Sequence, residues 1–198
     1  MADDRDQEIA ELRSQLDVEV GRLNRLVEVT GQLSSTLSLE ELLGMILSTA
    51  TELLDAETSS LFLLDEETGD LTVEVAAGEP AESVVKQRVP AGEGVVGWVV
   101  TNGEPAVVED PTGDDRFYHG VDEKTGFETR NLLAAPMRTR ERTIGVVEVI
   151  NKRSGAFVDR DVEVAVALAG QAGIAIDNAR LYARLADAVV TSRLSYRI

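Results

Sequence analysis

The spacing of apolar residues changes along the chain, and each change marks a different kind of element. From Asp6 to Leu37, apolar side chains recur at intervals of three and four, as on a helix with one apolar face. Because such a stripe needs a partner, the pattern predicts a coiled-coil arm over residues 1–37, although a helix packed on its own domain also satisfies it. The stripe consists of Ile9, Leu12, Leu16, Leu23, Leu26, Leu33 and Leu37.

A second helix and a β-hairpin are predicted next. Ser38 followed by Glu41 has the spacing of a capping box and starts a helix that extends to about Asp55. Two apolar runs rich in strand-forming residues, 59–65 and 71–75, flank a Thr-Gly turn. This period-two pattern is typical of two antiparallel strands.

The middle of the chain alternates short apolar runs with polar loops. A glycine-containing loop, Pro90–Gly94, leads into a short helix, Val95–Thr101, and a polar loop covers Asp110–Glu128. Further strands are expected at Ala106–Glu109, Asn131–Arg138 and Thr143–Asn151. Strands arranged as hairpins, with helices before and after them, favour an α+β fold around an antiparallel sheet.

The last segment has a helical pattern from Asp159, the expected N-cap, to Ile198 without a proline. At 1.5 Å per residue such a helix would be roughly 60 Å long, which exceeds the size of a compact domain. Its second half carries a coiled-coil-like seam of Ile174, Asn178, Leu181, Leu185 and Ala188. We therefore expect residues 183–198 to continue a signalling helix into an output domain of a longer protein.

The amino-acid composition argues against several classes of binding partner and catalytic site. The 198 residues have a formal charge of −17, which disfavours nucleic acid and anionic membranes as partners. There is no cysteine and one histidine, His119, so thiol catalysis, thiolate metal sites and histidine-based triads lack their residues. No apolar run approaches the roughly 18 residues of a membrane span. We expect a soluble, cytoplasmic protein with no catalytic residues and no metal site.

Two features favour a small-molecule pocket. Gly92, Gly94 and Gly97 leave an unhindered backbone at the start of a short helix, where free N–H groups attract an anion such as phosphate. The long loop that follows is of the kind that often covers a binding site, and it closes with hydroxyl residues Thr125 and Thr129. The acidic pairs 114–115 and 122–123 are interpreted as solvated surface.

Several motifs of this chain resemble a known family. They are Ser60–Asp65; a stretch from Asp115-Arg116-Phe117 through Gly120-Val121-Asp122 and Thr125-Gly126-Phe127 to Thr129–Leu133 and Pro136; Gly145–Lys152 with Phe157 and Asp161; and Ala172–Tyr182. Together they resemble a GAF domain, specifically the regulatory GAF domains of cyclic nucleotide phosphodiesterases and related bacterial adenylyl cyclases. The resemblance covers about residues 39–182, so we place the sensory domain at 38–182.

The resemblance implies a GAF-type fold, a six-stranded antiparallel sheet flanked by helices, with a lidded pocket for a purine cyclic nucleotide, cAMP or cGMP. It also implies a regulatory role, with closure transmitted through a parallel homodimer of helices. The matching ligand-binding positions are Ser60, Ala76, Ala77, Val95, Val96, Asp110, Tyr118, Thr125, Thr129 and Glu148. The matching structural motif is Asn151, Lys152, Phe157 and Asp161, in which Lys152 and Asp161 form a salt bridge.

Two alternatives stay open at this stage. Ala76 and Ala77 stand where binding members often carry an aromatic and an acidic residue, and a missing stacking ring costs about 1 kcal/mol or more. These positions favour a structural dimerisation domain without a nucleotide ligand. A sensor of another small metabolite is the other alternative. The sequence does not decide between cAMP and cGMP, since an amide or hydroxyl rotates to read either base.

Overall fold

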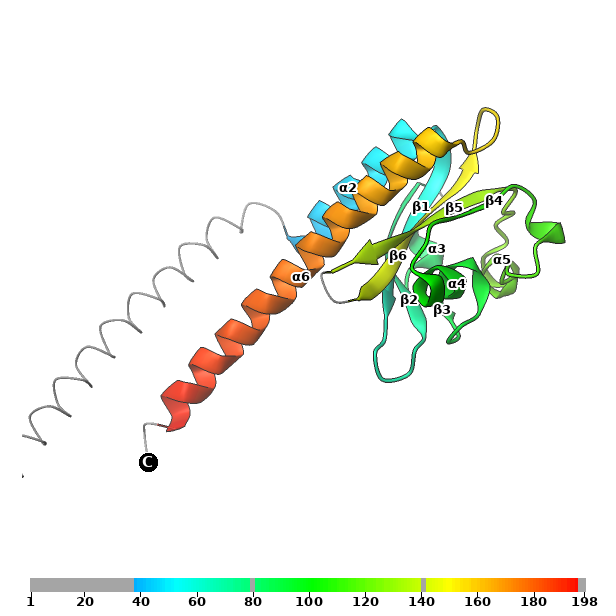
Figure 1. The fold of residues 1–198 in the computed structure, drawn as a ribbon. Helices are drawn as coiled ribbons and strands as arrows, with labels where there is room; N and C mark the ends of the chain where they lie inside the picture. The colour runs from blue at the N-terminus through cyan, green and yellow to red at the C-terminus, as the bar shows by residue number, and fades with distance from the viewer. Residues whose placement is uncertain (1–37, 79–80, 140–141, 196–198) are drawn as a thin grey trace, which may run out of the picture. The chain divides into compact units, whose positions relative to one another are not determined.

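A six-stranded antiparallel sheet organises the protein, with helices on both of its faces. The computed structural model describes residues 38–78, 81–139 and 142–195, so the arm expected over residues 1–37 lies outside the described residues. The strands follow the order β3-β2-β1-β6-β5-β4. Figure 1 shows α2 and α6 alongside each other on one face of the sheet, and α4 on the other. The predicted α+β class is confirmed.

The elements have the following bounds. The strands are β1 Ala56–Leu64, β2 Leu71–Gly78, β3 Arg88–Val89, β4 Ala106–Val108, β5 Leu132–Arg138 and β6 Thr143–Lys152. The helices are α2 Leu39–Leu53, α3 Ala81–Val84, α4 Gly94–Asn102, the 3-10 turn η1 Pro111–Gly113, α5 Gly120–Thr125 and α6 Asp159–Ser195.

Strand alternation divides the interior into two cores, one on each face of the sheet. Because successive side chains point to opposite faces, Val147 and Val149 of β6 pack under α2 and α6, whereas Val146 and Ile150 pack on the opposite side. The helix-side core includes Leu47 and Ala169, and the opposite core includes Val99 of α4. Both faces are therefore buried, which explains why the central strands are almost continuously apolar.

A β-bulge in β2 changes the face of the sheet toward which the side chains beyond it point. Leu61 of β1 lies opposite Val75, but the next residue, Phe62, lies opposite Val73. The extra residue reverses the alternation, as bulges do. Ala76 consequently lies across from Ser60 on the α4 side, and Ala77 packs against the helix-side core.

Three expectations are corrected by the structure. The stretch Asp110–Glu128 is not a loop throughout, because it contains η1 and α5. The α5 helix ends at Gly126, whose φ of 71° is the left-handed C-cap conformation that glycine adopts readily. The short elements α3 and β3 were not predicted, and two residues of β3 are too few to produce a pattern.

The start of α6 is the third correction. The carbonyl of Val158 accepts the first helical hydrogen bonds, so the N-cap is Val158 rather than Asp159. Asp161, three residues later, accepts a hydrogen bond from the Val158 N–H at 2.9 Å, which is the returning half of a capping box.

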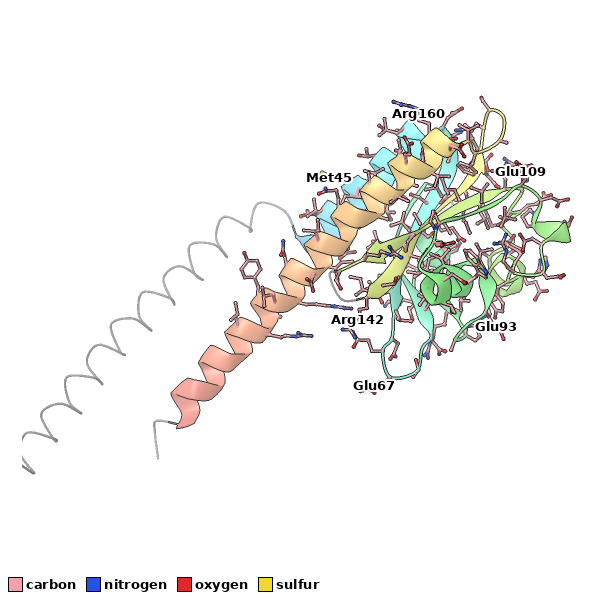
Figure 2. The ribbon with its side chains drawn as sticks, viewed as in Figure 1. Met45, Glu67, Glu93, Glu109, Arg142 and Arg160 are labelled. Atoms are coloured by element: carbon pink, nitrogen blue, oxygen red, sulfur yellow. The ribbon has the colours of Figure 1, made fainter. Side chains whose placement is uncertain are left out.

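The outer surface of the helix layer is partly apolar. Ile174 and Leu181 of α6 are each 54% exposed, and Leu185 and Asn178 are exposed beside them. Met45, labelled in Figure 2, is exposed on α2. The seam predicted on α6 is therefore left open to a partner at these positions. Among the described residues, no helix has the length and apolarity needed to cross a membrane.

Substitution of Gly145 tests the close pairing of β6 with β1. A Cβ at this position would overlap the carbonyl oxygen of Phe62 and the terminal methyl of Met137. We expect Gly145→Ala to lower the free energy of unfolding by about 2 kcal/mol or more, measured by urea denaturation. Gly170→Ala is the control, since nothing lies within 4 Å of the added methyl. It should be neutral or stabilise α6 by up to about 1 kcal/mol. Equal changes in the free energy of unfolding for Gly145→Ala and Gly170→Ala would contradict the close packing of Gly145.

Candidate ligand-binding site

A cavity lies on the α4 side of the sheet. Its walls come from the sheet, from α4 and from the segment between β4 and β5, residues 110–130, which we call the lid segment. Most of the lining is apolar, and four aromatic side chains contribute to it: Phe62, Phe117, Tyr118 and Phe127.

The N-terminus of α4 forms one wall of the cavity. Val95 and Val96, both predicted site residues, line it together with Gly94. Gly94 has a φ of 74°, and Gly97 packs so closely on Gly92 that a Cβ would collide with its backbone. Glu93, the N-cap residue, makes no side-chain capping hydrogen bond. The first N–H groups of α4 therefore remain available for an anionic ligand group.

The sheet contributes the polar wall. Ser60 of β1 lies directly opposite Glu148 of β6, and both side chains line the cavity. Among the described residues, neither side chain makes a hydrogen bond. Thr58, which also lines the cavity, already donates its hydroxyl to the carbonyl of Ala77 at 2.7 Å. Ser60 and Glu148 thus retain hydrogen-bonding capacity for a ligand.

Glu148 has an unusual electrostatic environment. Its side chain is only 9% exposed, and no cationic side chain is found among the described residues lining the cavity. Burial, with a smaller contribution from the nearby carboxylate of Asp122, raises the pKa of Glu148 from 4.5 to about 8. The site therefore favours the neutral form of the Glu148 carboxyl.

Two hydrogen bonds to the carboxylate of Asp122, which we call the lid clamp, hold the end of the lid segment against α5. The backbone N–H and the hydroxyl of Thr129 both donate to the carboxylate of Asp122, each at 2.9 Å. Thr125 donates its hydroxyl to the carbonyl of Val121 at 2.9 Å. The two threonines line the cavity, but their hydroxyl protons are used within the lid, so they face a ligand as acceptors.

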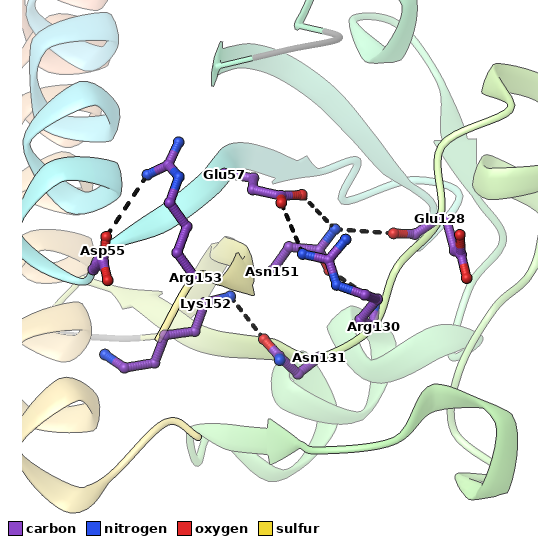
Figure 3. Close-up of polar contacts among 8 residues, drawn as sticks. All are labelled: Asp55, Glu57, Glu128, Arg130, Asn131, Asn151, Lys152 and Arg153. Carbon is purple, nitrogen blue, oxygen red and sulfur yellow. Dashed lines mark hydrogen bonds and ion pairs between the residues drawn. The ribbon is translucent and has the colours of Figure 1, made fainter. Parts of the chain in front are cut away.

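Asn151 connects the end of the lid to the sheet (Figure 3). It is fully buried with a φ of 60°, a left-handed conformation that asparagine tolerates better than most residues. Its carbonyl oxygen accepts from the Arg130 N–H at 2.7 Å, and its amide donates to Glu57 and to the Glu128 carbonyl, both at 2.9 Å. Hydrogen bonds from Arg130 and Asn151 lower the pKa of Glu57, whose carboxylate pairs with Arg130 at 2.7 Å.

Lys152 extends this connection to the helix layer. Its ammonium lies 2.9 Å from the carboxylate of Asp161 at the start of α6, and both side chains are 13% exposed. It also donates to the carbonyl of Leu54, just after α2, at 3.0 Å. The ion pair expected between Lys152 and Asp161 is therefore present, with Phe157 buried 5.4 Å from the ammonium.

The remaining predicted residues lie apart from the cavity lining. Asp110 caps η1 by accepting from the backbone N–H of Thr112 at 3.0 Å. Ala77 packs toward the helices, and Ala76, although on the α4 side, is not part of the lining.

Sequence reasoning missed several lining residues. Asp122 was interpreted as solvated surface, yet it lines the cavity and anchors Thr129. Gly126, as a helix C-cap, is the sequence signal that could have revealed α5 and hence the position of Asp122. The rings of Phe117 and Phe127 supply aromatic surface that the alanines of β2 lack.

Comparison with known proteins agrees with this architecture. A family model for the GAF domain matches residues 36–177. The chain belongs to the GAF domain family. A probable 3′,5′-cyclic phosphodiesterase of Caenorhabditis elegans is 30% identical over 170 residues, which are 81% of this chain and 23% of that protein. A dual 3′,5′-cyclic-AMP and -GMP phosphodiesterase 11A of Takifugu rubripes is 33% identical over 168 residues, 79% of this chain and 19% of that protein. This GAF chain thus spans less than a quarter of either relative.

Solved structures share the GAF fold. The GAF domain of a phosphoenolpyruvate-protein phosphotransferase from Coxiella burnetii superposes with a TM-score of 0.68 at 24% identity, covering 82% of this chain and 96% of that one. Free methionine-R-sulfoxide reductase from Neisseria meningitidis gives a TM-score of 0.61 at 19% identity, covering 73% and 81% of the two chains. The fold therefore occurs in proteins of different function.

The raised pKa of Glu148 gives the GAF domain a specific pH dependence. The folded state holds this proton up to about pH 8, whereas the unfolded chain releases it near 4.5, so stability falls as the pH rises between these values. Glu148→Gln has no such proton. We compare the free energies of unfolding of the variant and the wild type by denaturant titration at several pH values. The difference, variant minus wild type, should rise by roughly 2–4 kcal/mol between about pH 5 and about pH 8. If the free energies of unfolding of the wild type and of Glu148→Gln changed with pH in the same way, Glu148 would not be neutral in the folded state.

Proposed function

We propose that this GAF domain is a regulatory sensor that binds a purine cyclic nucleotide under the lid segment and performs no catalysis itself. The observation that carries the proposal is one cavity with two kinds of polar wall. The uncapped N-terminus of α4 suits a phosphate, and the paired Ser60 and Glu148 side chains suit a base or ribose. A cyclic nucleotide carries both kinds of group in one rigid molecule.

The rest of the cavity is compatible with such a ligand. Its aromatic side chains provide surfaces on which a purine stacks, a contact worth about 1 kcal/mol or more. The backbone of α4 supplies the anion-binding groups in place of lysine or arginine, which the described lining lacks. The phosphodiesterase relatives, which are named for 3′,5′-cyclic nucleotides, support the choice of ligand class.

Ligand binding would be transmitted through the helix layer. The lid segment ends at Glu128 and Arg130, which are tied to Asn151, and the adjacent Lys152 is tied to the beginning of α6. A movement of the lid therefore acts on groups next to the helices α2 and α6. In the proposed arrangement, these helices form a parallel homodimer and carry the signal to an output domain of a longer protein.

Ligand titration tests the proposal directly. Trp98 is the single tryptophan, and its ring lies 5.1 Å from the guanidinium of Arg116 in the lid segment. We expect sub-millimolar binding of cAMP or cGMP in calorimetry, accompanied by a change in Trp98 fluorescence as the lid closes. Linear 5′-AMP and 5′-GMP serve as controls for the cyclic phosphate. A folded protein that gives no heat with either cyclic nucleotide would favour a structural dimerisation role.

Thr129→Ala tests the role of the lid clamp. The substitution removes the hydroxyl that bonds Asp122 and faces the cavity, so we expect about tenfold weaker nucleotide binding by a domain that remains folded. Thr49→Ala is the matched control, because Thr49 makes its hydroxyl bond to Met45 on the exposed surface of α2. Unchanged affinity in Thr129→Ala would count against this site.

The dimer interface is tested on the seam of α6. Leu181→Glu places a charge on the exposed seam and should convert a dimer to a monomer, measured by light scattering. Ala183→Glu introduces the same side chain at an exposed position outside the Ile174–Leu181 seam and should leave the dimer intact. A monomeric wild-type chain, or a dimeric Leu181→Glu variant, would overturn the assignment of this interface.

A further inference from the structure

A groove on the solvent-facing side of α4, which we call the outer groove, adjoins the cavity. Three residues, Gly94, Phe117 and Tyr118, line both the groove and the cavity. They therefore form the wall that separates the two spaces. The other residues lining the groove are Gly92, Glu93, Trp98, Thr101, Asn102, Asp115 and Arg116.

The wall closes where Tyr118 meets Gly94. A Cβ added to Gly94 would lie 3.1 Å from the Cβ of Tyr118, so the tyrosine packs directly on the glycine backbone. On its other side, the Tyr118 ring packs on Gly120, where an added Cβ would collide with ring atoms. Among the described residues, the Tyr118 hydroxyl makes no hydrogen bond. The ring can therefore leave the wall without breaking one.

The two ends of the lid segment are held in different ways. After α5, Thr129 is fixed by the lid clamp, and the N–H of Arg130 donates to the buried Asn151 at 2.7 Å. Before α5, the guanidinium of Arg116 lies over the ring of Trp98 on α4, 5.1 Å from its centroid. Hydrogen bonds to a buried group cost more to break than a partly exposed cation–π contact. The lid segment should therefore open at its first end and turn about its second end.

Asp114 holds Arg116 in position on Trp98. Its carboxylate accepts from Nε and Nη2 of Arg116 at 2.9 and 2.6 Å, which fixes the plane of the guanidinium. These hydrogen bonds lower the pKa of Asp114, so the pair stays ionised at neutral pH. The N–H of Phe117 donates to the carbonyl of Asp114 at 2.9 Å, so the same turn also positions the wall.

We propose that the ligand enters and leaves the cavity through the outer groove, when Phe117 and Tyr118 move away from Gly94, and that the Arg116–Trp98 contact sets the rate of this exchange. The inference rests on the proposed function and specifies how its site is reached. Arg116 and Trp98 line the groove but not the cavity, so they act on the wall rather than on a bound ligand. The contact holds the wall closed before and after binding. Its loss therefore raises the association and dissociation rates by a similar factor and leaves Kd unchanged.

The experiment measures rate constants for the whole chain by surface plasmon resonance, with cAMP and cGMP as probes. For Arg116→Gln, we expect both rate constants to rise roughly fivefold and Kd to stay within about twofold of the wild-type value. Arg142→Gln is the matched control, because Arg142 forms a comparable two-bond pair with Glu66, at 2.7 and 2.6 Å, outside the groove lining. It should keep the wild-type rates.

A bulky side chain in the groove tests the route itself. Thr101→Trp places a large ring in the outer groove and should slow association and dissociation by at least about threefold. Thr49→Trp is the matched control. Both threonines are exposed helix residues whose hydroxyls donate to the carbonyl four residues earlier, at 2.9 Å for Thr101 and 2.8 Å for Thr49. Thermal unfolding verifies that each variant is folded.

Amide hydrogen exchange tests the direction of opening without any nucleotide. In the ligand-free chain, we expect the N–H of Phe117 to exchange at least about tenfold faster than the N–H of Arg130. In Arg116→Gln, exchange at Phe117 should accelerate further, whereas exchange at Arg130 should not change.

Each result supports or overturns a stated part of the inference. An Arg116→Gln variant with wild-type rates, or with a changed Kd and only one changed rate, would overturn the role of the Arg116–Trp98 contact. Wild-type rates in Thr101→Trp would overturn the route through the groove. Exchange at Arg130 as fast as at Phe117 would overturn the direction of opening. The absence of binding by both nucleotides would instead overturn the proposed function, and hydrogen exchange would still decide how the lid segment opens.

Discussion

The antiparallel pairing of β1 with β6 is the constraint on which the rest of the structure depends. In this register, Ser60 lies opposite Glu148, and Ser59 lies opposite Val149. Because side chains alternate between faces, the first pair faces the cavity and the second faces the helices. A shift by one residue would move Glu148 under α2 and α6 and place apolar side chains in the binding wall. Ser59 supports the register on its own face by donating to the carbonyl of Leu47 at 3.0 Å.

Polar contacts at the end of the central strand β6 join structures on the two faces of this sheet. Asn151 and Lys152, at the end of β6, bond to the lid segment and to the helix layer respectively. A ligand under the lid segment would act on the helices only to the extent that it binds one arrangement of these groups better than another, about 1.4 kcal/mol for each tenfold difference. The polar cluster in Figure 3 is where such a difference would be expressed, because it lies between both regions.

The acidic character of the protein also shapes its site. The chain has a formal charge of −17, and the described cavity lining contains carboxyl groups but no cation. An anionic ligand would therefore depend on the backbone dipoles of α4, and the buried carboxyl on the sheet is favoured in its neutral form. Both properties come from the same cause, namely that no lysine or arginine of the described residues extends into this cavity.

The sequence by itself determined the elements with strong periodicity and the residues of the family motifs. The helix ending near Leu53, the hairpin of β1 and β2, and the strands β5 and β6 were all predictable, because burial of one face imposes a local period. The motif that ends in Lys152 and Asp161 was also recognisable, and its ion pair is present.

Only the tertiary structure decided the environment of each site residue. The bulge in β2 turns Ala77 away from the cavity, and the fold brings Asp122 near Glu148, although 26 residues separate them in the chain. Short elements leave little periodic signal: β3 has only two residues, and α5 spans fewer than two helical turns. The protonation of a carboxyl depends on burial and on charges contributed by distant segments, and a local pattern of residues contains neither.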